Sequence, residues 1–299
     1  MKRITDNVYA LTGFRGCNSG YVVTAEGVVL IDTPQLPTKA VAMREEILRK
    51  GPLRFLINTE YHLDHIFGNH YFSGLCPVVS HQHTLESFWS FRPGVDAYDY
   101  MVDLVKNDDP QGMKLMPSRK DLSTNAPTIT FGESLTLRVG EHVFELIHTP
   151  GHTKGQIAVY VPKEKVLFVG DTVFCERQVW FHSADPDSWL DSLDFLGTLE
   201  VDHIVPGHGP VCDKTYLLKQ GAYLREWITA VSVGLANGWS REECVRRISF
   251  LDRLPMDTGH ENSGPMIQQW NIERIFDYLL GRIERFSSKR PPAEPRYVR

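Results

Sequence analysis

Apolar and polar positions along the first part of the chain predict a series of short strands with a helix among them. Glycines separate the apolar runs, and four of these runs are expected to be strands: residues 7–12, 19–24, 27–32 and 53–58. Residues 37–50 instead combine apolar and charged side chains, with Pro37 near the start and Gly51 after the end, as is typical of a helix. A further strand is expected at 77–80.

The pattern changes after this series and then returns to strands. Residues 84–116 are aromatic and helical in character, and they lead through a loop at 107–112. From 128 to 168 the pattern is again that of strands, with turns at 132–133, 140–141 and 162–163. We therefore expect a helical insertion between two series of strands.

The last third of the chain is predicted to be mostly helical. A helix at 187–196 and a strand at 203–205 end the second series, and residues 214–286 are helical with breaks near Gly238 and across 255–264. Two successive series of strands and helices favour an α/β fold with two sheets and helices outside. The expected organisation is a catalytic domain at 1–213 with an aromatic helical insertion at 84–127, a helical C-terminal extension at 214–286, and a flexible tail at 287–299.

Composition excludes several classes of function. The 299 residues are 42% hydrophobic and 23% charged, which is ordinary for a globular protein. The net charge of −5 argues against nucleic acid as a partner, because a mildly acidic surface repels phosphates. We see neither a signal peptide nor an apolar run of the roughly 18 residues that a membrane span needs. Five scattered cysteines without a paired motif suggest reduced thiols and a cytoplasmic protein.

Histidines and carboxylates form four short motifs, each after an apolar run that is expected to be a strand. The first is the segment from Thr59 to His65, which contains Glu60, His62, Asp64 and His65. The other three are Pro150-Gly151-His152, Gly170-Asp171-Thr172 and Pro206-Gly207-His208. Imidazole nitrogens and carboxylate oxygens are the usual protein ligands of first-row divalent cations, and side chains at neighbouring strand ends can converge. Together the motifs predict a metal site.

Each motif alone also has a simpler explanation. A histidine beside Pro-Gly is often a turn residue, and Gly-Asp-Thr is commonly a helix cap. All four motifs in this order, each following a strand, are much harder to explain without a metal.

The motifs resemble those of the metallo-β-lactamase superfamily, and the resemblance covers residues 7–209. It implies a four-layer αβ/βα sandwich with a dinuclear metal site between the sheets. By the same resemblance, Glu60, His62 and His152 hold the first ion, and Asp64, His65 and His208 hold the second. Asp171 bridges the two ions beside a hydroxide, and Asp64 also orients that nucleophile. Asp32 matches a position that supports a ligand histidine, although a turn aspartate is an equal alternative.

Glu60 departs from the pattern, because the family usually has histidine at this position. We interpret it as a ligand through its carboxylate. An added oxygen donor moves the preference of the site toward iron or manganese, so zinc remains the default for the two divalent ions by a narrow margin.

Asp171 decides the expected activity. The β-lactamases of the superfamily generally lack this bridging aspartate, whereas it is typical of glyoxalase II-type thioesterases, lactonases and phosphodiesterases. The resemblance therefore implies a metallo-hydrolase that cleaves a carboxylic ester, thioester, lactone or phosphoester with a metal-bridged hydroxide, rather than a true β-lactamase.

Aromatic residues are the candidates for a substrate pocket. Those of the insertion form either a cap over the metals or core and homodimer contacts: Phe88, Trp89, Phe91, Tyr98, Tyr100 and Met101. Trp180 and His182 are candidates for the opposite wall, although a surface histidine is the simpler expectation for His182. Trp227, Trp239 and Trp270 are expected over the same face or between subunits. No convincing basic cluster is evident, which favours a weakly charged small-molecule ester or lactone.

Two other functions stay open at this point. Glu60 motivates an iron-dependent, oxygen-using oxidoreductase on the same fold, although no residues remain for a flavin domain. A non-catalytic binding protein with a degenerate site is the third hypothesis, but decay would rarely leave seven plausible ligands in place.

Overall fold

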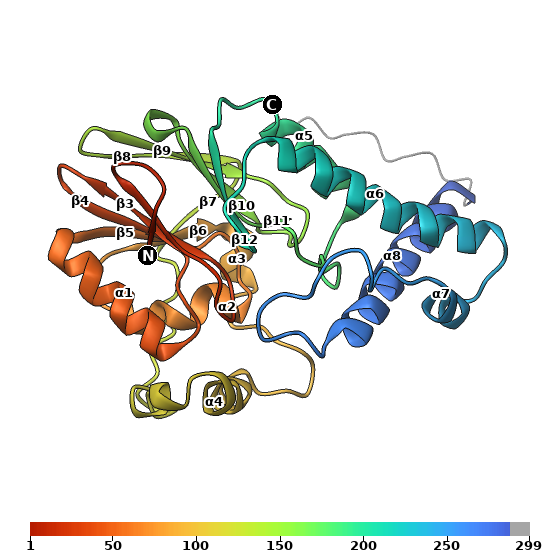
Figure 1. Ribbon diagram of the computed structural model, residues 1–299, viewed down its shortest axis with the longest axis horizontal. Helices are drawn as coiled ribbons and strands as arrows, with labels where there is room; N and C mark the ends of the chain where they lie inside the picture. Colours follow the sequence, from red (N-terminus) through yellow and green to blue (C-terminus); the bar gives the residue numbers. More distant parts are fainter. Residues whose placement is uncertain (288–299) are drawn as a thin grey trace.

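The computed structural model describes residues 1–287, which form two β-sheets packed against each other with helices outside (Figure 1). The first sheet has seven strands, in this order across the sheet: β1 (Lys2–Arg3), β2 (Val8–Leu11), β3 (Ser19–Thr24), β4 (Gly27–Ile31), β5 (Leu53–Ile57), β6 (Val78–His81) and β7 (Ile129–Phe131). The second has five: β12 (His203–His208), β11 (Val166–Phe174), β10 (Ile157–Val161), β9 (His142–His148) and β8 (Ser134–Val139). The predicted fold class is confirmed.

The helices expected at 37–50 and 187–196 are present, and the C-terminal extension is largely helical as predicted. They are α1 (Pro37–Lys50), α2 (Leu63–Ile66), α3 (Gln82–Glu86), α4 (Ala97–Asp108), α5 (Pro186–Leu196), α6 (Thr215–Ala236), α7 (Arg241–Arg247) and α8 (Gly264–Ser287). Short 3-10 turns occupy Phe67–Phe72, Pro110–Lys114 and Pro162–Glu164. The tail expected at 287–299 lies, apart from Ser287, outside the described residues.

Strand direction brings the predicted motifs to one edge of the sandwich. β4, β5, β6 and β7 run parallel to one another, and β11 runs parallel to β12. Parallel strands end at the same edge of a sheet. The segment after β5 in the first sheet and the end of β12 in the second can therefore meet at one edge of the sandwich. Pairing of β11 with β12 is irregular between Phe168 and Phe174.

The main core lies between the two sheets. Val29, Ile57, Phe144 and Phe168 are buried there with their neighbours from both sheets. Every residue of β10 and β11 is buried, because one face of these strands meets the first sheet and helices cover the other. This explains why these strands are continuous apolar runs rather than alternating ones.

The insertion is less helical than the sequence predicted. Residues 87–96 contain no helix, and α4 extends to Asp108, into the segment that was expected to be a loop. The carboxylate of Asp109 explains the end: it accepts hydrogen bonds from the backbone and hydroxyl of Thr38 and from the backbone of Gly112. Asp109 thereby joins α1 to the turn that follows α4.

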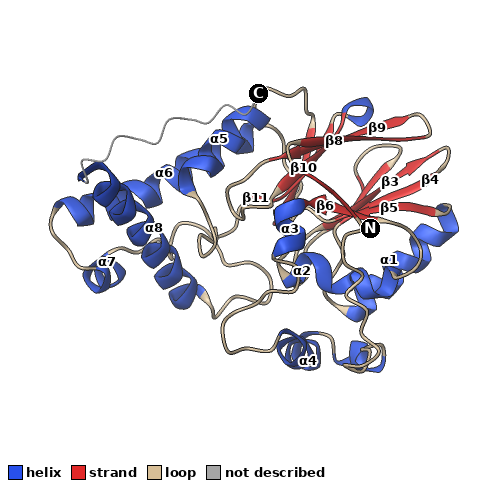
Figure 2. Cartoon of the chain, turned by 180° about the vertical axis from the view of Figure 1, so that it is seen from behind, coloured by secondary structure: helices blue, strands red, loops and turns tan. Residues whose placement is uncertain are grey.

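The C-terminal extension shares a core with the second sheet. One buried cluster contains Trp227 of α6, Ile272 of α8 and Phe250 from the segment between α7 and α8, together with residues of β11 and α5. Figure 2 shows α5, α6 and α8 side by side beyond that sheet. Across residues 1–287, none of the helices combines the length and apolarity that crossing a bilayer would require.

Candidate metal centre

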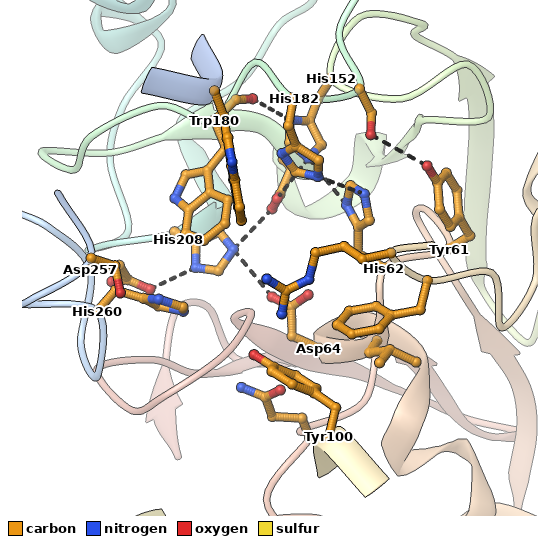
Figure 3. Close-up of a pocket in the computed structure, with 18 of the residues that line it drawn as sticks. Tyr61, His62, Asp64, Tyr100, His152, Trp180, His182, His208, Asp257 and His260 are labelled. Atoms are coloured by element: carbon orange, nitrogen blue, oxygen red, sulfur yellow. Dashed lines mark hydrogen bonds and ion pairs between the residues drawn. The ribbon is translucent and has the colours of Figure 1, made fainter. Parts of the chain in front are cut away.

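The seven predicted ligands lie together at the edge of the sandwich, and five of them line a cavity of about 500 Å³. Figure 3 shows four of these five, His62, Asp64, His152 and His208, pointing toward one another. We call these seven side chains the cavity floor. Two lie in the loop after β5, two lie in α2, and one each comes from the β9–β10 loop, from β11 and from the end of β12: Glu60, His62, Asp64, His65, His152, Asp171 and His208. Glu60 and His65 are completely buried beneath the others.

Two groups of ligand atoms can be distinguished in the floor. Potential donor atoms of Glu60, His62, His152 and Asp171 all lie within 4.8 Å of one another. In this group His62 Nδ1 is 2.9 Å from Glu60 Oε2, and His152 Nε2 is 3.4 Å from Asp171 Oδ2. These distances are compatible with a single ion among the four side chains.

The second group consists of Asp64, His65 and His208, which meet the same distance criterion. Asp171 faces this group with its other oxygen: Asp171 Oδ1 is 3.2 Å from His65 Nε2 and 3.3 Å from His208 Nε2. Asp171 therefore lies between the two groups. This is the arrangement that the sequence resemblance implied, including Glu60 in the first group.

Three of the floor histidines form hydrogen bonds through Nδ1, on the side of the ring opposite the other ligands. His65 Nδ1 donates to Asp32 Oδ2 at 3.0 Å, and His208 Nδ1 donates to Asp257 Oδ2 at 2.7 Å. His152 Nδ1 donates to the backbone oxygen of Trp180 at 2.8 Å. These contacts fix the tautomer that leaves each Nε2 free to bind a cation.

Backbone conformation positions Asp32 for this role. It directly follows β4 with a φ of 53°, a left-handed conformation that aspartate and asparagine tolerate better than most residues. Its oxygens also accept hydrogen bonds from the backbone and hydroxyl of Thr59, next to Glu60. Asp32 thus joins β4 to the start of the ligand loop as well as to His65.

Glycine is required beside the Asp171 carboxylate. A Cβ atom at Gly207 would overlap Asp171 Oδ1, so no other residue fits between Asp171 and the chain that carries His208. Gly170 has a φ of 46° at the irregular pairing of β11 with β12. The sequence placed Asp171 just after a strand, whereas the structure places it within β11 at this irregularity.

The charges of the floor depend on one another. Burial alone would raise the pKa of Asp171, but His208 and His65 hold that pKa well below its ordinary value. The pKa of Asp64 is also lowered against burial, by His65 and His208. Conversely, Asp171, Asp257 and Asp64 raise the pKa of His208 against its burial. The carboxylates of Asp171 and Asp64 are therefore ionised near neutral pH and need positive charge beside them, which protons on imidazole or bound cations can supply.

The residues present fit a pair of cations. Glu60 Oε2, His65 Nε2 and Asp171 Oδ1 are buried and have no hydrogen-bond partner, although other floor atoms surround them. Buried polar atoms without partners are costly, at roughly 1–3 kcal/mol each. A divalent ion in each ligand group would satisfy these atoms, and nitrogen with oxygen donors suits zinc, iron or manganese.

The cavity wall differs in part from the pocket that the sequence predicted. Trp180 and His182 line the cavity, and His182 is exposed into it, with its Nε2 3.2 Å from His62 Nε2. Phe88 and Trp89 do not line it; Trp89 instead packs near Phe67 in a core below α4. We call the following residues the cavity wall: Phe91, Arg92, Tyr100, Trp180, His182 and Trp270.

The sequence analysis missed several polar residues of the cavity. Asp257 and His260 come from the break between α7 and α8, and Arg15 and Arg92 also line the cavity. Burial and nearby Arg15 lower the pKa of His260 to about 4, so this imidazole is neutral at pH 7. A signal was present in the stretch from Asp257 to His260, where acid, glycine and histidine interrupt a helical region. The sequence analysis found no convincing basic cluster, whereas the structure brings Arg15 and Arg92 to the same cavity.

Comparison with known proteins gives a family match over the sandwich. The profile of the Metallo-beta-lactamase superfamily matches residues 12–208, which include every floor residue. Linear primary-alkylsulfatase of a Pseudomonas species is 25% identical over 286 residues, covering 86% of this chain and 54% of the relative. Hydroxyacylglutathione hydrolase of Thermosynechococcus vestitus is 29% identical over 188 residues, covering 59% of this chain and 60% of the relative. The chain thus spans little more than half the length of either relative.

Solved structures share the fold at lower identity. A stereoselective inverting sec-alkylsulfatase from Pseudomonas has a TM-score of 0.66 and 16% identity, over 93% of this chain and 50% of that one. A metallo-beta-lactamase from Pontibacter korlensis has a TM-score of 0.57 and 22% identity, over 75% of this chain and 97% of that one. At these identities the likeness concerns the fold alone.

Proposed function

We propose that this chain, which belongs to the metallo-β-lactamase superfamily, is a metal-dependent hydrolase that cleaves an ester-type bond with the help of two divalent ions. The observation that carries the proposal is the convergence of the two ligand groups on Asp171. The Nε2 atoms of His65, His152 and His208 all lie within 3.4 Å of an oxygen of this carboxylate. The names of the relatives, an alkylsulfatase and a hydroxyacylglutathione hydrolase, support hydrolysis of esters in a broad sense.

The floor residues form two sets of ligands, one for each ion. Glu60, His62 and His152 would hold one ion, Asp64, His65 and His208 would hold the other, and Asp171 lies between the two groups. Two ions bound there would lower the pKa of a coordinated water and polarise the oxygen of the bond under attack. The three carboxylates among these ligands offset most of the charge that the ions bring into a buried place.

The wall residues bind and orient the organic part of the substrate. The rings of Phe91, Tyr100, Trp180 and Trp270 border the cavity above the floor, and they come from the insertion, the segment after β11 and α8. Apolar rings around a small opening favour an organic group over water, which also strengthens electrostatic interactions at the floor. We place the catalytic unit in residues 1–213, to which the extension adds Asp257 and part of the wall.

Zinc is the default metal, and Glu60 supports a second candidate. A carboxylate in the first ligand group adds a hard oxygen donor to a site that already contains Asp171 and Asp64. This favours iron or manganese more than a histidine would. An iron-dependent, oxygen-using oxidoreductase on the same fold is therefore the alternative function.

Metal analysis combined with an activity panel tests the proposal. Purified protein of known zinc, iron and manganese content is assayed on a lactone, a thioester, aryl esters, a phosphoester, a sulfate ester and a cephalosporin, with oxygen uptake recorded in parallel. We expect two metal ions per chain and hydrolysis of at least one non-lactam ester without oxygen uptake. Oxygen uptake by an iron-loaded protein that hydrolyses nothing would establish the alternative instead.

A further inference from the structure

Arg92 occupies a specific place in the cavity wall. Its guanidinium lies over the rings of Phe91 at 4.9 Å, Tyr100 at 5.3 Å and Trp270 at 5.6 Å from the ring centres. Phe91 and Tyr100 belong to the insertion, whereas Trp270 belongs to α8 of the extension. The arginine therefore sits where these two additions to the sandwich meet, at the border of the cavity.

The charge of Arg92 has no acidic counterpart. Among the side chains that the structure describes, those of residues 1–282, none supplies a carboxylate within ion-pair distance of this guanidinium, although three rings surround it. Arg119 of the same insertion provides a contrast, because it pairs with Asp96 at 2.9 Å and Asp99 at 2.7 Å. A guanidinium that faces a cavity and lacks a partner is available to bind a planar oxyanion through several N–H groups.

A second arginine adds positive charge to the same cavity. Arg15 Nη1 is 3.2 Å from Asp108 Oδ2 and also donates to the backbone oxygen of Gly259, so that part of its charge is balanced. Its Nε atom, however, is buried and has no hydrogen-bond partner. Two divalent ions at the floor would offset the carboxylates of Glu60, Asp64, Asp171 and Asp257, and this would leave the charge of Arg92 unbalanced. The local field would therefore attract an anion.

The geometry points to an anionic, partly apolar substrate, and this inference rests on the proposed hydrolytic function. We propose that an oxyanion group of the substrate, a carboxylate, sulfate or phosphate, binds Arg92. The apolar part of the substrate lies against the rings of Phe91, Tyr100, Trp180 and Trp270. The oxyanion is either a separate group of the substrate or belongs to the ester that is cleaved, as in a sulfate ester. In both cases its negative charge lies beside Arg92.

Matched substrates test this selectivity. Metal-loaded wild type, R92Q and R246Q are assayed on 4-nitrophenyl butyrate, on 4-nitrophenyl hemisuccinate, which has the same acyl length with a terminal carboxylate, and on 4-nitrophenyl sulfate. Arg246 is an exposed arginine of α7 outside the cavity and serves as the control. We expect wild type to prefer an anionic ester, and R92Q to lower the ratio of anionic to neutral kcat/KM by about tenfold, the worth of one charge-assisted contact. R246Q should keep the wild-type ratio. Preference for the hemisuccinate identifies a remote oxyanion, and preference for the sulfate identifies a scissile one.

A binding measurement separates this inference from the proposed function. Titration of 1-hexanesulfonate and of hexanamide is followed by tryptophan fluorescence, since Trp180 and Trp270 line the cavity. In R92Q the Kd of the sulfonate should rise about tenfold, that of hexanamide should change much less, and R92K should lie between wild type and R92Q. If R92Q weakens both ligands equally, Arg92 is only part of the wall and the inference fails. If sulfonate binding depends on Arg92 but the protein hydrolyses no ester, the proposed hydrolase function is refuted instead. If the protein hydrolyses neutral esters and shows no preference for anionic ones, only the inference about Arg92 is refuted.

Discussion

The cavity floor and the cavity wall are built in different ways. Floor residues such as Glu60 and His65 are fully buried, and strand ends or backbone hydrogen bonds hold them in place. Wall residues such as Arg92 and Trp270 come from the insertion and the extension, and ring contacts hold them. The sandwich thus supplies the whole floor, whereas the two additions supply most of the wall, which also contains Trp180 and His182 of the sandwich.

One residue crosses this division. Asp257 belongs to the extension, yet it accepts a hydrogen bond from His208 of the floor at 2.7 Å. Asp32 makes the equivalent contact to His65 from within the sandwich at 3.0 Å. The extension is thus joined to the metal centre as well as to the wall.

The most severe way to break the floor is to remove the residue shared by both ligand groups. Asp171→Ala should release bound metal and lower kcat/KM by at least about a thousandfold, because metal ions contribute several kcal/mol of transition-state stabilisation. Metal content by mass spectrometry and ester hydrolysis on the same sample provide the measurement. Asp191→Ala, at an exposed position of α5, is the control. An Asp171→Ala protein that keeps both its metal and its activity would rule out the proposed centre.

The floor could be predicted from the sequence because its signal is local. His62, Asp64 and His65 lie within one short segment, and Gly207 directly precedes His208 for a steric reason that the structure explains. The strand pattern predicted two sheets, although β7 from the second series joins the first sheet, and the bounds predicted for α1 agree with the structure.

The wall could not be predicted in the same way. Its contacts join residues far apart in sequence, such as Arg92 with Trp270, and no periodicity encodes such a pair. Trp89 and Phe91 are two positions apart and both aromatic, yet only Phe91 lines the cavity. The backbone of Trp89 has a φ of 62°, so the chain turns between them in a way that helical periodicity does not anticipate. Composition alone therefore identified the right segment, but it could not separate Phe91 and Tyr100, which line the cavity, from Phe88 and Trp89, which do not.

The second prediction concerns how firmly the extension is joined to the sandwich. Trp227 is 1% exposed in the core shared with α5 and β11, and its ring stacks on Phe250 at 4.3 Å. Trp227→Ala should lower the free energy of unfolding by about 3–5 kcal/mol, as is typical of large cavities in a core. Leu218→Ala on the same helix should change it by no more than about 0.5 kcal/mol, because Leu218 is 75% exposed.

Urea unfolding followed by circular dichroism gives both values. A shared core predicts that the whole transition moves to lower urea in Trp227→Ala. Two separate transitions, of which only one responds to the substitution, would show that the extension unfolds independently of the sandwich. The floor and the part of the wall that comes from the extension would then belong to two separately folding domains.

The smallest effect compares the two supporting carboxylates directly. Asp32→Asn and Asp257→Asn each preserve side-chain shape, and asparagine also tolerates the left-handed backbone of residue 32. Each change replaces a carboxylate that accepts the Nδ1–H of a floor histidine, so each should weaken metal binding by about 10- to 100-fold. Competition with a chelator of known affinity measures this loss, with the exposed Asp252→Asn as the control. Similar losses in both variants would mean that the extension is part of the metal centre. A loss confined to Asp32→Asn would mean that the Asp257 contact serves only to attach the wall, and that the sandwich holds its ions alone.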